Sequence, residues 1–173
     1  MKKIALIMAV LLLLTGCSGN AQETEHALAE AACKQPPELT IVGVDVKIVN
    51  LGSTWNYVNA DGVWVSDRIE GKHPMECKNV LKKAVSMDEV LELSFAVKPD
   101  SICVRTWMDT EFGFVNTAPG KTSVFAPAEI LLKPEVGAYV YEVIAVWEND
   151  ESFNGVAHYC FYLGYSEPAP QPR

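Results

Sequence analysis

The sequence is short of positive charge and has no basic cluster. Its 173 residues include 14 Lys and Arg against 22 Asp and Glu, which gives a net charge of −8. Residues 1–16 carry Lys2 and Lys3 and no acid, so without them the net charge is −8 minus +2, or −10. A chain this acidic repels nucleic acid and anionic lipid headgroups, so we expect no nucleic-acid partner and no membrane binding through charge alone.

The N-terminus lacks an apolar run long enough to span a membrane. The run at residues 4–14 covers eleven residues, and as a helix it would reach about 17 Å. A bilayer core needs about 30 Å, or roughly 20 residues. Two lysines precede this run and small residues follow it, so the pattern predicts an export signal over residues 1–16 rather than a permanent span.

The signal ends at Leu14-Thr15-Gly16, and Cys17 follows directly. The four positions resemble the lipobox of bacterial lipoprotein precursors. The resemblance implies cleavage before Cys17, attachment of a diacylglyceryl group to its thiol, and acylation of the new N-terminus with fatty acids such as palmitate. Two or more acyl chains hold a protein stably at a membrane. We therefore expect lipidation of Cys17 and a location on the extracytoplasmic side of the cell membrane; the alternative is an ordinary secretory signal.

Motifs for common catalytic chemistry are absent. There is no GxSxG elbow, no glycine-rich phosphate loop and no CxxC pair. His158 and Cys160 share one face of a strand, but a surface histidine beside a structural cysteine explains this pair better than Cys-His catalysis. His73 and Cys77 are four apart, and Pro74 opposes a helix that would direct both to one metal. We expect no catalytic residue, no metal site and no cofactor.

Most of the chain alternates apolar and polar residues with a period of two, which predicts β-strands. The segments that fit are LTIVGVDVKIVNL (one strand, or two divided at Gly43), LELSFAV, SICVRTWM, TSVFAPAEILL, YVYEVIAVWE as a central strand, and GVAHYCFYLGY. TWNYV and GVWVS flank Asn59-Ala60-Asp61-Gly62, a hairpin signal. EVLELS and MECKNVLKKA could also be helical, and MECKNVLKKA is the better candidate for one or two helical turns.

This pattern predicts an all-β, immunoglobulin-like antiparallel sandwich of about seven to nine strands with at most one short helical segment. We place the sandwich at residues 34–165. Small and polar residues 17–33 suit a tether that lifts the domain off the membrane. The proline-rich residues 166–173 suit a disordered tail.

Several different short motifs lie along residues 36–163. They are Pro36-Pro37-Glu38-Leu39, Trp55-Asn56-Tyr57, His73-Pro74, Pro99-Asp100-Ser101 with Trp107, Gly137-x-Tyr139-x-Tyr141-Glu142-Val143 with Trp147, and Gly155-x-Ala157-x-Tyr159-x-Phe161. In these motifs the chain resembles uncharacterised domains of Gram-positive bacterial lipoproteins and of the exposed portions of some membrane sensors. The resemblance implies a fold and a location but no reaction.

Four cysteines remain once Cys17 is assigned to the anchor, and disulfides persist outside the membrane. Three pairings are possible, with free thiols or metal ligation as alternatives. We favour Cys33–Cys77, which would join the domain's start to its longest irregular segment. Cys103–Cys160 then remains as the second bridge. The plain immunoglobulin strand order weighs against it, because the strand YVYEVIAVWE would lie between those two cysteines.

Two functional hypotheses follow. The first is a non-catalytic binding or sensing module for an unknown envelope protein or glycan; peptidase inhibition is a variant. Trp64 in the hairpin is the candidate binding surface, since the other three tryptophans suit the core. The second is an envelope glycan hydrolase that uses loop carboxylates. The acidic residues of loop 148–151 are such carboxylates; they also suit calcium or, more simply, a solvated turn.

Overall fold

A computed structural model describes residues 34–86, 90–126, 130–148 and 151–166. The predicted signal peptide, Cys17, the tether, Cys33 and nearly all of the tail lie outside the described residues. The strands are β1 (Leu39–Ile41), β2 (Val49–Val58), β3 (Trp64–Ile69), β4 (Lys83–Ser86), β5 (Leu91–Phe95), β6 (Ser101–Met108), β7 (Lys121–Phe125), β8 (Leu131–Leu132), β9 (Gly137–Trp147) and β10 (Phe153–Tyr165), and the 3-10 turns are η1 (Pro74–Asn79) and η2 (Asp109–Glu111).

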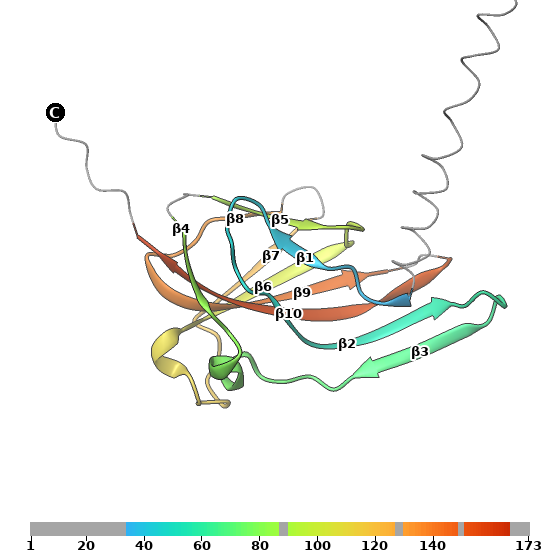
Figure 1. The fold of residues 1–173 in the computed structure, drawn as a ribbon, viewed down its shortest axis with the longest axis horizontal. Helices are drawn as coiled ribbons and strands as arrows, with labels where there is room; N and C mark the ends of the chain where they lie inside the picture. The colour runs from blue at the N-terminus through green and yellow to red at the C-terminus, as the bar shows by residue number, and fades with distance from the viewer. Residues whose placement is uncertain (1–33, 87–89, 127–129, 149–150, 167–173) are drawn as a thin grey trace, which may run out of the picture.

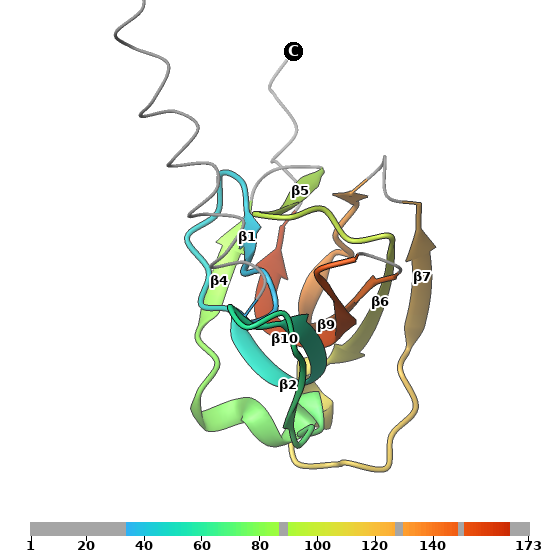
Figure 2. The same cartoon turned by 90° about the vertical axis from the view of Figure 1, so that its right-hand side faces the viewer.

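The strands form two sheets of unequal size. The large sheet has the order β3-β2-β10-β9-β6-β7, with β4 added in parallel beside β10, and the small sheet has the order β1-β5-β8. The small sheet covers one face of the large sheet, and the 3-10 turns lie on the opposite side (Figure 1, Figure 2). The predicted all-β sandwich is therefore confirmed, and β9 is central, as predicted, between β10 and β6.

The strand count within the described residues is ten rather than seven to nine. LTIVGVDVKIVNL divides into β1 and β2, and Gly43 between them has a φ of 78° that favours glycine. TSVFAPAEILL supplies both β7 and β8. Part of MECKNVLKKA forms η1, while its last residues begin β4.

The main core lies between the two sheets. Its centre is Trp55, which is 1% exposed, stacks on Phe153 with ring centroids 5.3 Å apart, and meets Trp147 edge to face at 5.4 Å. The indole N–H of Trp147 donates to the Val97 carbonyl at 3.1 Å, so its one polar atom is satisfied. We call this side of the large sheet the inner face and the opposite side the outer face.

A second, smaller cluster explains why β9 and β10 are apolar on both faces. It packs beneath η1 on the outer face and consists of Leu51, Met75, Cys77, Leu81, Trp107, Val140 and Cys160. The indole N–H of Trp107 donates to the Thr117 carbonyl at 3.1 Å. The cluster covers one end of the outer face only.

The structure contradicts the predicted Cys103–Cys160 bridge. Cys103 on β6 pairs with Ile144, and Cys160 on β10 pairs with Glu142, so β9 separates the two cysteines. Strands are about 4.8 Å apart, which puts Cα atoms two strands apart at roughly 10 Å, beyond the limit of about 7 Å for a disulfide. Among the described residues, no disulfide joins Cys77, Cys103 and Cys160 to one another. Cys33 lies outside the described residues, so its pairing stays a prediction.

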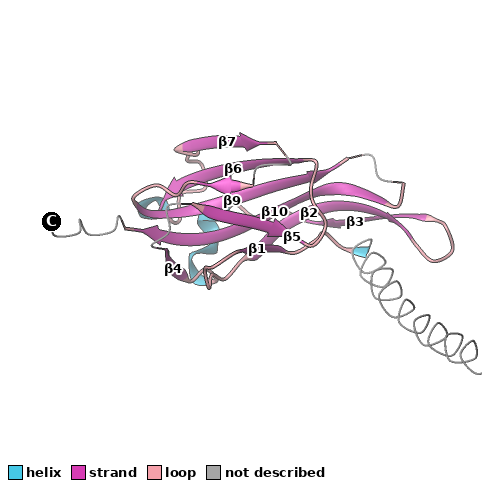
Figure 3. Ribbon diagram, turned by 90° about the horizontal axis from the view of Figure 1, so that it is seen from above, coloured by secondary structure: helices cyan, strands magenta, loops and turns pink. Residues whose placement is uncertain are grey.

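The predicted hairpin joins β2 to β3 and extends toward one end of the molecule (Figure 3). Asn59 closes its turn, because its side-chain oxygen accepts hydrogen bonds from the Asp61 and Val63 amides at 3.0 and 2.9 Å. Gly62 has the positive φ, 75°, that this turn requires. Within the described residues, no helix has both the length and the apolar character to cross a membrane.

Candidate functional site

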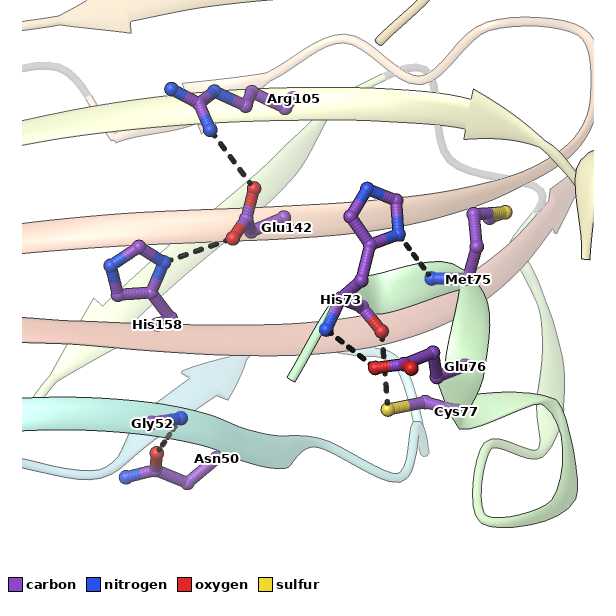
Figure 4. Close-up of polar contacts among 9 residues, drawn as sticks. All are labelled: Asn50, Gly52, His73, Met75, Glu76, Cys77, Arg105, Glu142 and His158. Carbon is purple, nitrogen blue, oxygen red and sulfur yellow. Dashed lines mark hydrogen bonds and ion pairs between the residues drawn. The ribbon is translucent and has the colours of Figure 1, made fainter. Parts of the chain in front are cut away.

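A buried carboxylate lies at the middle of the outer face. Glu142 is on β9, between apolar neighbours, and is 5% exposed. Its Oε1 accepts a hydrogen bond from Nδ1 of His158 on β10 at 2.9 Å, and its Oε2 lies 3.6 Å from a guanidinium nitrogen of Arg105 on β6. Figure 4 shows the three side chains on three adjacent strands. Each carboxylate oxygen therefore has a partner, which offsets the cost of burying the charge.

His73 approaches the same site from η1. Pro74 does not disrupt the local structure but occupies the first position of this turn, which it favours, and His73 is the N-cap. The Met75 amide donates to Nδ1 of His73 at 3.3 Å, while the His73 amide donates to Oε2 of Glu76 at 3.0 Å. Because Nδ1 accepts, the ring proton is on Nε2. The ring meets Trp107 edge to face, with centroids 5.4 Å apart.

Two glycines bring the chain before His73 close to β2. The Lys72 amide donates to the Leu51 carbonyl at 3.0 Å, at the point where a bulge shifts the register between β2 and β10. A Cβ on Gly52 would lie 2.6 Å from the Cα of Gly71, closer than non-bonded carbons approach. Gly52 therefore has to be glycine for this crossing to form.

These groups line a hollow of about 290 Å³ that is open to solvent, which we call the Glu142 cavity. It is lined by Leu51, Gly71, Lys72, His73, Pro74, Arg105, Trp107, Glu142 and His158. With neutral histidines, two cations and one carboxylate give the lining a formal charge of +1, on a chain whose net charge is −8. A positive cavity on an acidic protein attracts negative groups of a ligand.

The buried cysteines near the cavity are poor nucleophiles. Burial raises the pKa of the Cys160 thiol well above its ordinary value, with further contributions from Cys77 and Glu142. Burial also raises the pKa of Cys77, although Lys72 partly opposes the shift. A raised pKa keeps each thiol protonated, and the thiolate is the reactive form. His158, which is two residues from Cys160, hydrogen-bonds to Glu142.

The structure separates the residues that the sequence singled out. Trp64 is 50% exposed at a different hollow of the outer face, and the other three tryptophans are buried, as predicted. His73 and Cys77, the pair four residues apart, meet through the backbone: the Cys77 sulfur lies 3.9 Å from the His73 carbonyl oxygen, while the His73 ring contacts Met75 and Trp107. Within the described residues, no three His, Cys, Asp or Glu side chains are placed to hold a metal ion.

Glu142 and Arg105 were not recognised as site residues from the sequence. One signal was available for Glu142: it is the single charged residue inside the apolar run YVYEVIAVW. Buried charges are rare unless they are paired, so this position indicates a partner on a neighbouring strand. Arg105 cannot be assigned as that partner without knowing that β6 lies beside β9.

Comparisons with known proteins gave no match: no family model fits the chain, and neither curated proteins nor solved structures match it.

Proposed function

We propose that the protein is a lipid-anchored module of the cell envelope that binds, without catalysis, an acidic group of its ligand in the Glu142 cavity. The observation that carries this proposal is the surplus of hydrogen-bond donors around one carboxylate that is already paired. Both oxygens of Glu142 are occupied, whereas Arg105 is 43% exposed and accessible to a ligand.

The donors that remain suit an oxyanion. Arg105 has guanidinium N–H groups beyond the one directed at Glu142, Lys72 has an ammonium group, and His73 has its Nε2–H. Carboxylates and phosphates accept several such bonds at once, and charge-assisted bonds are stronger than neutral ones. The ligand group expected here is therefore a carboxylate or a phosphate.

The geometry favours binding over the alternative of glycan hydrolysis. Glycosidases use two carboxyl groups about 5 to 10 Å apart. Among the described residues that line the Glu142 cavity, Glu142 is the single carboxylate, and Arg105 and His158 pair with it. The buried thiols nearby have raised pKa values and do not supply a nucleophile in its place.

Removing one donor should weaken anion binding without disturbing Glu142. We expect Lys72→Ala to weaken phosphate and glucuronate binding by about tenfold or more, since a charge-assisted hydrogen bond contributes roughly 1.5–3 kcal/mol. Isothermal titration calorimetry at constant ionic strength measures this loss. Arg68→Ala is the matched control, because it removes one positive charge from exposed strand β3 outside the cavity lining. Unchanged binding by Lys72→Ala, or equal losses in both variants, would contradict the proposal.

The lipid anchor is tested at Cys17. Cys17→Ala removes the thiol that the lipobox resemblance marks for lipidation, so the product should be uncleaved or released into the medium. Fractionation followed by mass measurement distinguishes these forms. Cys103→Ala, which leaves the lipobox intact, should stay with the membrane and carry the lipid. A processed Cys17→Ala protein that still sediments with membranes would show that the anchor is elsewhere.

A further inference from the structure

We infer that the outer face carries a second binding site, formed by Trp64, Asn56 and Asn154, that takes an uncharged sugar ring. The inference rests on the proposed binding function and names its ligand class, a glycan that also bears acidic groups. The acidic group would occupy the Glu142 cavity, and a neutral sugar residue of the same glycan would stack on Trp64.

The second site lies on the same face of the sheet as the cavity. Asn154 and His158 are four residues apart on β10, before the bulge, so both side chains point to the outer face. Their separation along the strand is roughly 13 Å at about 3.3 Å per residue. Asn154 pairs with Asn56 on β2, which pairs in turn with Ser66 on β3, two residues from Trp64. An extended ligand that lies along the strands therefore meets both sites.

Trp64 is placed as an accessible aromatic surface. It begins β3, the edge strand of the large sheet, and is 50% exposed, while the other three tryptophans are buried. It borders a hollow of about 300 Å³ lined by Asn56, Trp64, Val65, Ser66 and Asn154. None of these described lining residues is charged, so the hollow suits a neutral ligand with an apolar side, as a pyranose ring has.

The two asparagines supply the polar half of the site. The side-chain amide of Asn56 donates to the side-chain oxygen of Asn154 at 2.8 Å, which fixes both amides. This bond leaves the Asn56 oxygen as an acceptor and the Asn154 amide as a donor with no partner among the described residues. Adjacent hydroxyls of a sugar both donate and accept, so they complement this donor and acceptor. A preorganised amide pair beside an aromatic ring therefore selects a polyhydroxylated ring.

The test is a titration of the whole protein followed in ¹⁵N–¹H spectra, in which each of the four tryptophans has an indole signal. The probes are the neutral hexasaccharides cellohexaose, chitohexaose and mannohexaose, with decaproline as a competing aromatic-binding peptide. We expect at least one hexasaccharide to shift the Trp64 indole and the Asn56 and Asn154 amides, leaving the buried indoles unchanged. Trp64→Ala should weaken that binding by about tenfold or more, as loss of an aromatic anchor does, and Trp64→Phe should retain most of it.

Two outcomes would overturn the inference. One is that no hexasaccharide moves the Trp64 signal; the other is that decaproline moves it and the sugars do not, which would assign the site to a peptide. Lys72→Ala separates this inference from the proposed function, because it should weaken phosphate binding and leave neutral sugar binding intact. Sugar binding without anion binding would refute the cavity proposal alone, and anion binding without sugar binding would refute the Trp64 site alone.

Discussion

Gly52→Ala should lower the free energy of unfolding by about 2–3 kcal/mol, as overpacking of a tight contact does. The added methyl carbon would lie 2.6 Å from the Cα of Gly71 and 3.0 Å from the Ile69 carbonyl oxygen. Both neighbours are backbone atoms that cannot rotate away. Segment 69–73 would have to move off β2, and Lys72 and His73 would leave the Glu142 cavity with it. The variant should therefore also lose phosphate binding.

Gly71→Ala is the matched control for this substitution. It adds the same methyl group on the other side of the same crossing, where no atom lies within 4 Å of the new carbon. The expected change in unfolding free energy is below about 0.5 kcal/mol, the usual range for surface substitutions. Urea denaturation and calorimetry measure the two effects. Equal stability of the two variants would show that the crossing is not as close as the structure has it.

Trp55→Ala should lower the free energy of unfolding by about 3–5 kcal/mol, the cost of truncating a large aromatic residue in a core. Trp55 is 1% exposed and contacts two further aromatic rings, those of Trp147 and Phe153. Its removal leaves a void between the sheets that these rings cannot fill by rotation alone. Urea denaturation followed by circular dichroism gives the free energy directly.

Trp64→Ala is the control for Trp55→Ala, since it removes an identical side chain from a half-exposed position. Its unfolding free energy should fall by no more than about 2 kcal/mol, because about half of the side chain is already in water. This result also matters for the sugar-binding test, because a stable Trp64→Ala variant attributes lost binding to the ring rather than to unfolding. A loss above about 2 kcal/mol would place Trp64 in a packed core and contradict its exposure.

The strands and their central member were predictable because the information is local. Alternation along SICVRTWM assigns Ile102 and Val104 to one face and Cys103 and Arg105 to the other, and the structure keeps that division. Asn59 and Gly62 define the hairpin through bonds that span only a few residues. The exposure of Trp64 follows from its place in the hairpin, so this candidate surface was also identified from the sequence.

The sequence by itself determined the strand pattern, the hairpin and the motif at Cys17, while the tertiary structure alone decided the Glu142 cavity. Arg105, Glu142 and His158 meet across three strands, and no local pattern states which strands are neighbours or in what register they pair. The failed Cys103–Cys160 bridge has the same cause: both cysteines face outward, but β9 lies between them. Periodicity reports the face on which a side chain lies, whereas its neighbours depend on hydrogen bonding between residues far apart in the chain.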